Sequence, residues 1–201
     1  MFNILLDPLP DEWHGHKIDT DFQTGIQIAQ CMADEELSVK ERFFAARKLL
    51  FLDDCPADYK ELIESIQWFL NGWNDKITPS RSGKSSKSAK KKEIPSMDFD
   101  VDQWRIYAAF LAQYNIDLNR EQMHFWVFMG LLANLEECVF TNVVKIREKK
   151  IDSKMSKEEK NQLMEAKEDF KIQKAEEDYE TKAEQEERQA AIDEFNRLRG
   201  K

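Results

Sequence analysis

A low-complexity stretch in the middle of the chain is the feature that most constrains the fold. Residues 76–92 carry seven basic residues and no acidic residue, and the run TPSRSGKSSKSAKKK contains no large apolar side chain. Such a stretch cannot bury enough apolar surface to offset the conformational entropy lost on ordering. We therefore expect a flexible basic linker over residues 76–97, with a small helical module on each side.

The segment before the linker, residues 1–75, is expected to begin with a short β-hairpin. Residues 2–6 are apolar and lead into Asp-Pro-Leu-Pro-Asp, a pattern typical of a short strand that enters a turn. A second short strand is expected from Trp13 to Ile18, with Gly15 at the bend. The two strands would form the hairpin.

Three amphipathic helices are expected in the rest of this first module. Asp19 or Thr20 is the predicted cap of the first helix, and Ser38 with Glu41 forms a predicted capping box at the second. Apolar side chains at helical spacing from Tyr59 onward predict the third. The resulting core is small, because the three helices are short.

The second module, residues 98–151, contains the most hydrophobic part of the chain. Apolar side chains surround nearly the whole helix predicted from Met123 to Leu135, as in a buried core helix too short to span a membrane. Asn115 is expected to end the first helix of this module, and Asn119 to cap the start of the helix from Met123 to Leu135. A further helix is expected from Phe140 to about Lys150.

Three carboxylates, Asp98, Asp100 and Asp102, precede the first helix of this module. Negative charge at a helix start opposes the positive end of the helix dipole, so we interpret them as helix-start residues. A calcium loop is the alternative, but Gln103 and Ala109 stand where an EF-hand needs glycine and glutamate.

The second module resembles a known family. The residues that carry this resemblance are Phe99, Asp100, Ile106, Ala109, Phe110, Tyr114, Ile116, Asp117, Leu118, His124, Trp126, Phe128, Leu131, Leu132, Leu135 and Arg147. Asp21-Phe22 and Trp68-Phe69 add to it in the first module. Over about residues 1–150 the chain resembles the bacteriophage gene-product-fifteen family, whose members lie among the tail genes of long-tailed phages, between those for the tail tube and the tape measure.

The resemblance implies a tail assembly chaperone. Such a protein would coat the tape-measure protein, recruit tail-tube protein subunits in the host cell cytoplasm, and be absent from the finished virion. Its expected partners are the tape-measure and tail-tube proteins, and self-association is left open. No cofactor and no enzymatic activity are expected, because no nucleophile, base and orienting group can be assembled from the sequence.

Large aromatic side chains are the candidates for contact with a partner helix. They are Trp68, Phe69, Trp73, Trp104, Phe110, Tyr114 and Trp126. For Trp68, Phe69 and Trp73, at the end of the third predicted helix, closure of the core is the more common role. A groove that accepts an amphipathic helix is the functional alternative.

Residues 152–201 are expected to form a long charged helix or weak coiled coil. From Ser156 to Arg199 there is neither proline nor glycine, and Ser156 with Glu159 forms a second capping box. The stripe of apolar residues along this segment is interrupted by polar residues from Glu184 to Gln189. An interrupted stripe does not support a strong coiled coil.

Metal binding and secretion are disfavoured. His14 and His16 have no third ligand nearby, whereas zinc requires three or four. The cysteines Cys31, Cys55 and Cys138 are odd in number and widely spaced, as expected for reduced thiols. The first residues lack a basic leader, so no secretory signal is expected, and no apolar run is long enough to span a membrane.

The basic linker leaves one alternative function open. Lysine and arginine side chains bind phosphates, so a nucleic-acid-binding phage protein is the alternative to the chaperone. Against it, no aromatic residue interrupts the basic run and both flanking modules are acidic, which repels a polyanion. A solvated tether or a contact with an acidic protein fits the linker better.

Overall fold

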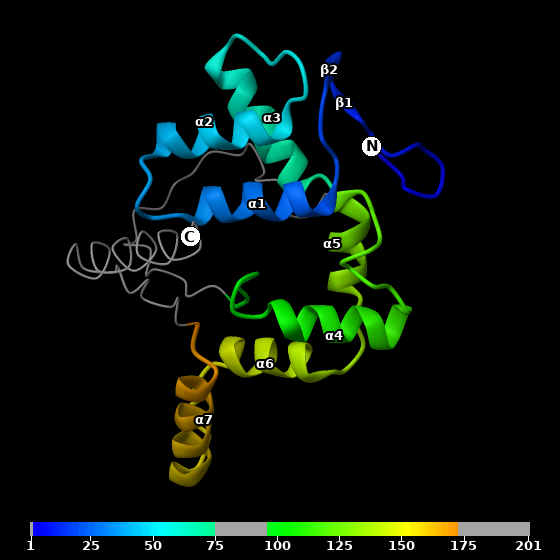
Figure 1. Cartoon of the computed structure of the whole chain (residues 1–201). Coiled ribbons are helices and arrows are strands. Elements are labelled where there is room, and N and C mark those ends of the chain that lie inside the picture. Colours follow the sequence, from blue (N-terminus) through cyan, green and yellow to red (C-terminus); the bar gives the residue numbers. More distant parts are fainter. Residues whose placement is uncertain (1, 75–95, 173–201) are drawn as a thin grey trace, which may run out of the picture.

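The structure is a computed structural model that describes residues 2–74 and 96–172. Over these residues the chain is mainly helical, with a short two-stranded hairpin near its start (Figure 1), as predicted. In chain order the elements are β1 (Glu12–Trp13), β2 (His16–Lys17), α1 (Phe22–Ala33), α2 (Val39–Leu50), α3 (Tyr59–Asn71), α4 (Gln103–Tyr114), α5 (Phe125–Ala133), α6 (Val139–Glu148) and α7 (Lys157–Asp169).

The hairpin is shorter than predicted, and residues 2–6 are not one of its strands. β1 and β2 pair in antiparallel register around His14 and Gly15, which have φ values of 49° and 87°. Residues 3–7 form a turn instead, because the Asp7 carboxylate accepts from the Asn3 N–H at 2.8 Å. The Asn3 carbonyl accepts from the N–H groups of Leu6 and Asp7. Short polar side chains that bind nearby backbone compete with strand formation in this way.

The first three helices form where the apolar spacing predicts them. The Ser38–Glu41 capping box is present at α2, and α3 begins at Tyr59. The cap of α1 is Asp21 rather than Asp19 or Thr20, and its carboxylate accepts from the N–H of Gln23. The Asp19 carboxylate instead accepts from the backbone N–H of Asp21 and the hydroxyl of Thr24.

Helix α5 is the centre of the fold. Asn115 ends the preceding α4, as predicted, and the structure shows it in the left-handed conformation. The cap of α5 is His124, not Asn119, because its ring Nδ1 accepts from the Trp126 N–H. A short antiparallel bridge brings this cap beside the start of α1, where the Phe125 N–H donates to the Thr20 carbonyl at 2.7 Å.

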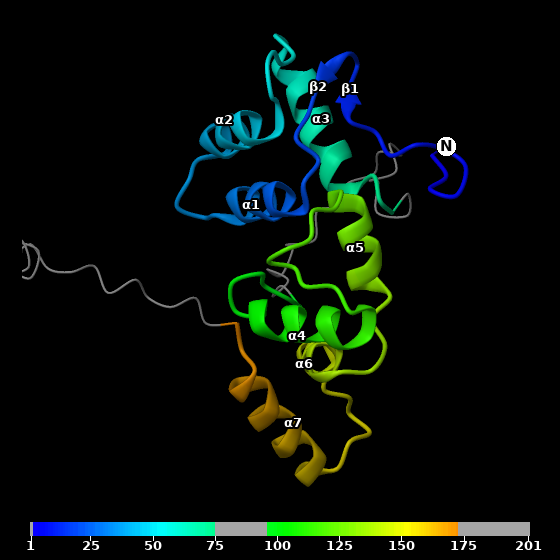
Figure 2. The same ribbon diagram turned by 45° about the vertical axis from the view of Figure 1, so that its right-hand side comes forward.

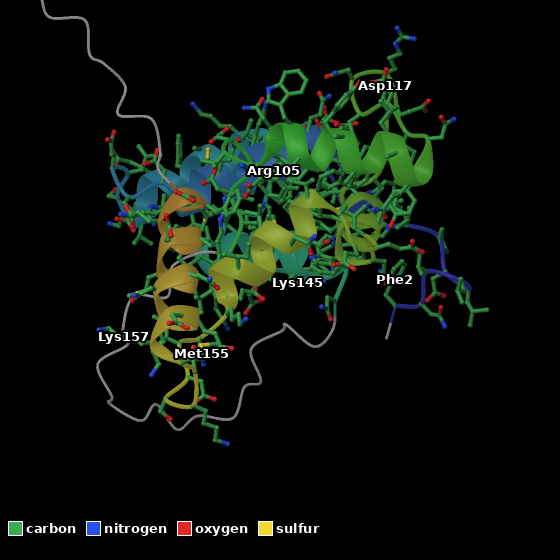
Figure 3. The ribbon with its side chains drawn as sticks, turned by 90° about the horizontal axis from the view of Figure 1, so that it is seen from below. Phe2, Arg105, Asp117, Lys145, Met155 and Lys157 are labelled. Carbon is green, nitrogen blue, oxygen red and sulfur yellow. The ribbon has the colours of Figure 1, made fainter. Side chains whose placement is uncertain are left out.

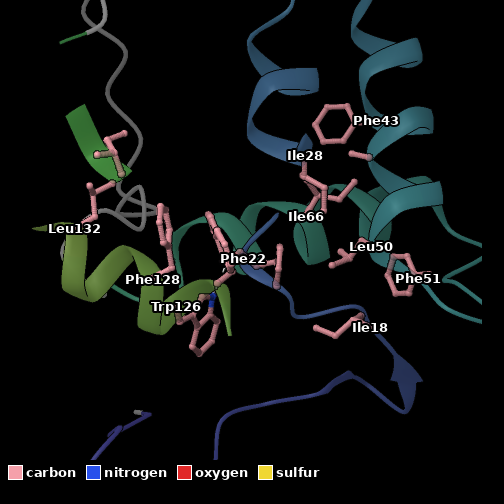
Figure 4. Packing of buried hydrophobic residues seen from close by; sticks show 14 of the residues in the cluster. Ile18, Phe22, Ile28, Phe43, Leu50, Phe51, Ile66, Trp126, Phe128 and Leu132 are labelled. Carbon is pink, nitrogen blue, oxygen red and sulfur yellow. Dashed lines mark hydrogen bonds between the residues drawn. The ribbon is translucent and has the colours of Figure 1, made fainter. Parts of the chain in front are cut away.

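One hydrophobic cluster draws on helices from both sides of the linker (Figure 4). Phe22 of α1 stacks on Phe128 of α5, with ring centroids 5.0 Å apart, and Phe69 of α3 stacks on Phe125 at 5.3 Å. The Trp126 indole N–H donates to the Phe69 carbonyl at 2.7 Å. The predicted boundaries at residues 75 and 98 stay a prediction, but α5 packs against both α1 and α3.

Two glycines permit this close packing. A Cβ atom on Gly25 of α1 would lie 2.1 Å from a ring carbon of Phe125. A Cβ atom on Gly72, which ends α3, would lie 2.3 Å from the Trp126 ring. Real Cβ atoms do not approach other atoms so closely, so the absence of a side chain at both positions lets α5 reach its neighbours.

Helix α7 extends away from α6, as Figures 1 and 2 show together. The predicted Ser156–Glu159 capping box is present at its start. The helix ends at Asp169, with Phe170 as its C-cap, so it does not continue toward Arg199 as one uninterrupted helix. The Arg147 guanidinium donates to the Phe170 carbonyl at 2.6 Å, which satisfies a backbone acceptor at this end. The prediction for residues 173–201 lies outside the described residues.

Candidate partner-binding surface

A half-open apolar cleft lies between α1 and α4. Its volume is about 300 Å³. The residues that line it are Phe22, Gln23, Ile26, Phe99, Gln103, Trp104, Ile106, Tyr107, Leu118, Asn119 and Phe128. Its polar lining is made of uncharged amides and the Tyr107 hydroxyl, and α1 has no charged side chain along its whole length.

Trp104 stands at this cleft with 73% of its surface exposed, the largest exposed aromatic area among the described residues. It contacts Tyr107 edge to face, with ring centroids 6.0 Å apart. The two residues lie one helical turn apart on α4, so their rings share one face of that helix. Of the seven candidate residues from the sequence, Trp104 is the one whose ring is open to a partner.

Three other candidates are buried in the core. Phe69 and Phe110 have no exposed surface, and Trp126 is 3% exposed. Phe110 stacks on Phe128 at 5.1 Å, so its ring closes the core between α4 and α5. Closure of the core, the more common role, therefore applies to all three in this conformation.

The remaining candidates are partly buried. Trp68 packs against Trp13 and Trp126, with ring centroids 4.8 Å and 5.1 Å away. Tyr114 donates its hydroxyl proton to the Leu131 carbonyl at 2.9 Å, and Trp73 packs against the core cluster. Trp68 therefore joins the hairpin and α3 to α5, whereas Tyr114 joins α4 to α5.

A second exposed apolar group lies on the turn near the start of the chain. Ile4, Leu5 and Leu6 are 54%, 88% and 81% exposed. The turn holds them outward, because Asn3 and Asp7 close it with hydrogen bonds to nearby backbone N–H groups. A strand at residues 2–6, as predicted from the sequence, would not have presented these three side chains together on an exposed turn.

The buried ion pair between Asp102 and Arg147 is a feature that sequence reasoning missed. Asp102 stands at the helix start as predicted, as the N-cap residue of α4, but it has no exposed surface and its carboxylate makes no capping hydrogen bond. The Arg147 guanidinium donates to both carboxylate oxygens, at 2.6 Å and 3.1 Å, and Arg105 donates to one of them at 2.8 Å. The residues that carry the family resemblance include Arg147 but not Asp102.

Arg147 also joins distant parts of the chain. It donates to the carbonyls of Ser96 and Phe170, which lie close to the two segments outside the described ranges. Burial by itself raises the pKa of Asp102, but the hydrogen bonds and charge of Arg147, with help from Asp98 and Arg105, hold this pKa below its ordinary value. The site therefore has a structural role, as a clamp between α4, α6 and the end of α7.

His124 is a structural histidine. Its Nδ1 accepts from the Trp126 N–H at 3.0 Å, so Nε2 carries the proton and donates to the Pro10 carbonyl at 3.0 Å. Burial lowers the pKa of the ring, and the hydrogen bond to Pro10 opposes this shift. The neutral ring is therefore the form that the fold accommodates.

The described residues contain no cluster of three or more potential metal ligands. His14 stacks on Trp13, whereas His16 pairs with the Asp54 carboxylate at 2.8 Å, so the two imidazoles have different partners. The three cysteines are unpaired thiols and partly buried. None of the described helices is both long enough and apolar enough to cross a bilayer.

Comparison with known protein families identifies the family of this chain. A family model described as Bacteriophage Gp15 protein matches residues 5–172, a range that includes every helix and strand of the described fold. A search of curated proteins found no match, and neither did a search of solved structures. The match spans well over half of the 201 residues. The chain therefore belongs to the Bacteriophage Gp15 protein family.

Proposed function

We propose that this phage protein is a tail assembly chaperone. It would shield the tape-measure protein in the host cytoplasm, help to recruit tail-tube subunits, and leave before the virion is complete. The observation that carries the proposal is the family match over residues 5–172, because the family resemblance implies a role in tail assembly. The proposed role is one of binding and contains no catalytic step.

Physical shielding is the proposed mechanism. A long helical chain with one apolar face would aggregate while it waits for tube subunits, because such a face is a large exposed apolar patch. Exposed apolar side chains such as Trp104, Leu5 and Leu6 would cover parts of this face. The net charge of −9 would keep each complex dispersed through mutual repulsion.

Release requires each contact to be modest. Many weak contacts repeated along one chain give high avidity in total, yet each copy can be displaced separately when a tube subunit arrives. A cleft of about 300 Å³ and an exposed apolar turn, both within the described residues, offer small contact areas, which supports weak, repeated binding.

Co-expression tests the proposed function. The tape-measure protein is produced with the full chain or with an unrelated acidic helical protein of similar size as the control. We expect the full chain to raise the soluble yield of the tape-measure protein and to elute with it as one complex. An unchanged yield with no shared elution peak would overturn the proposal.

Nucleic-acid binding through the basic linker is the second proposal, supported by seven basic residues without an acidic one in residues 76–92. A mobility-shift titration at low salt tests it, because phosphate contacts weaken steeply as salt rises. If this second proposal holds, the full chain shifts the nucleic acid and a variant without residues 80–92 does not. No shift by the full chain would rule it out.

A further inference from the structure

The cleft between α1 and α4 is apolar along its walls and acidic at both ends. At one end the Asp100 carboxylate accepts from the Gln30 side chain at 2.6 Å, so it lies where α4 begins and α1 finishes. At the other end the Asp117 carboxylate accepts from the Tyr107 hydroxyl at 3.1 Å. Figure 3 shows Asp117 in the loop beyond α4.

The charged groups near the two ends are mostly negative. Asp98 lies beside Asp100, and Glu121 follows Asp117. Arg120 pairs with Asp117 at 3.3 Å, but its side chain is 84% exposed, and an exposed pair of this kind exchanges readily with another cation. Arg105 points away from the cleft, since it contacts Asp102 and the Phe170 ring.

The exposed edge of the cleft is formed by two aromatic residues of the kind that often contribute most to binding. Tryptophan and tyrosine are enriched among the residues that dominate binding energy, and the Trp104–Tyr107 pair forms the edge of this cleft. A second copy of this chain is a poor occupant, because it adds its own acidic charge to acidic ends. A partner with basic residues matches both the charge and the apolar walls.

We propose that this cleft binds one turn of an amphipathic helix whose apolar side chains are flanked on both sides by lysine or arginine. The apolar side chains would lie against Trp104, Ile26 and Leu118, and the flanking cations would pair with Asp100 and Asp117. The inference rests on the proposed function, since it names the surface and the chemistry with which the chaperone would hold segments of the tape-measure helix.

Binding of two designed peptides to the full chain tests the inference. Both peptides have about 18 residues, enough to hold a helix, and the same leucine stripe. One carries lysines on each side of the stripe and the other carries glutamates at the same positions. We expect the lysine peptide to bind about tenfold or more tightly than the glutamate peptide by fluorescence anisotropy, and this preference to shrink as salt rises.

Variants of exposed residues locate the binding site. Trp104→Ala is expected to weaken binding of the lysine peptide about tenfold, because a large aromatic contact at the edge of the cleft is lost. The double variant Asp100→Asn with Asp117→Asn is expected to remove most of the preference for lysine. Phe44→Ala is the matched control, since Phe44 is an exposed aromatic residue on α2. The affinity of this variant for the lysine peptide should stay within about twofold of that of the unchanged protein.

Several results would overturn the inference. Equal affinity for the two peptides would show that the carboxylates do not select a basic partner. If Trp104→Ala had no effect on peptide binding, or Phe44→Ala had an equal effect, the peptide would not bind in this cleft. These outcomes are separable from failure of the proposed function. If the tape-measure protein becomes soluble equally well with the Trp104→Ala variant, the chaperone role holds and the cleft is not its surface. If the peptides bind as expected but co-expression fails, the cleft inference holds and the chaperone role does not.

Discussion

Loss of the Arg147 side chain is expected to be among the most costly single changes in this fold. Arg147→Met keeps an apolar stem of similar length but removes the guanidinium, whose side chain is 6% exposed and makes a bidentate pair with Asp102. The variant leaves a fully buried carboxylate with only Arg105 and the Asp98 N–H as partners. Breaking a buried ion pair from one side costs about 3–5 kcal/mol.

The lower part of that range, about 3 kcal/mol, is expected because Arg105 still compensates the carboxylate. Arg105→Ala is the matched control. Its side chain is 30% exposed and makes one contact with Asp102, so about 1 kcal/mol is expected. The exposed Lys171–Glu168 pair sets the baseline, and Lys171→Ala should stay within about 0.5 kcal/mol. Urea unfolding followed by circular dichroism measures all three free energies of unfolding.

The pH dependence has a defined sign. The pKa of Asp102 is lowered in the folded protein, so its contribution is present above its ordinary value of 3.8 and is lost as the pH falls through the lowered pKa. In Arg147→Met burial dominates and the Asp102 pKa should rise, which favours the folded variant at low pH. The difference between the two proteins is therefore expected to be largest near neutral pH, and to shrink as the pH falls from the raised Asp102 pKa of the variant to the lowered pKa of the original protein.

A double variant isolates the charge effect. Asp102→Leu combined with Arg147→Met replaces the pair by apolar side chains, and such replacements are often close to neutral. It is expected to be more stable than Arg147→Met alone. The reasoning would be refuted if the double variant were less stable than the single one, or if Arg105→Ala and Arg147→Met cost the same.

Two further predictions concern helix α5. Gly25→Ala should destabilise the fold by about 1–3 kcal/mol, since its Cβ would lie 2.1 Å from Phe125, whereas Gly130→Ala, with nothing within 4 Å, should be neutral or slightly stabilising; equal effects in urea unfolding would contradict this. Burial lowers the pKa of His124, so its contribution to stability is complete above its ordinary value of 6.5 and declines as the pH falls from there to the lowered pKa. His124→Asn keeps a capping side chain and should flatten this part of the pH profile, and an unchanged slope would contradict the prediction.

Local features of the fold were predictable from the sequence. Both serine–glutamate capping boxes are present, and α4 ends at Asn115, where the sequence predicts them. Each depends on side chains that meet their backbone partners within three or four residues, so the signal lies in the sequence itself. The strand predicted at residues 2–6 is wrong because the Asp7 carboxylate binds the Asn3 N–H and closes a turn. The cap predicted at Asn119 is wrong because the His124 ring accepts the hydrogen bond from the first turn of α5.

The candidate surface was predictable only in part. The sequence offers seven aromatic side chains as candidates, but it does not distinguish Trp104, which is exposed, from Phe110 and Trp126, which are buried. Exposure depends on which helix covers which face, and that depends on residues far away in the chain. Helical spacing places Trp104 and Phe110 on a helix without stating what packs against either side.

The sequence by itself determined that this chain is helical, where most helices start and stop, and to which family it belongs. Only the tertiary structure decided that α5 packs against α1 and α3, that Asp102 pairs with a residue 45 positions away, and that a cleft opens beside Trp104. The physical reason is range. Hydrogen bonds and apolar periodicity within one helix involve neighbours in sequence, whereas burial and ion pairing between helices depend on how their faces fit together.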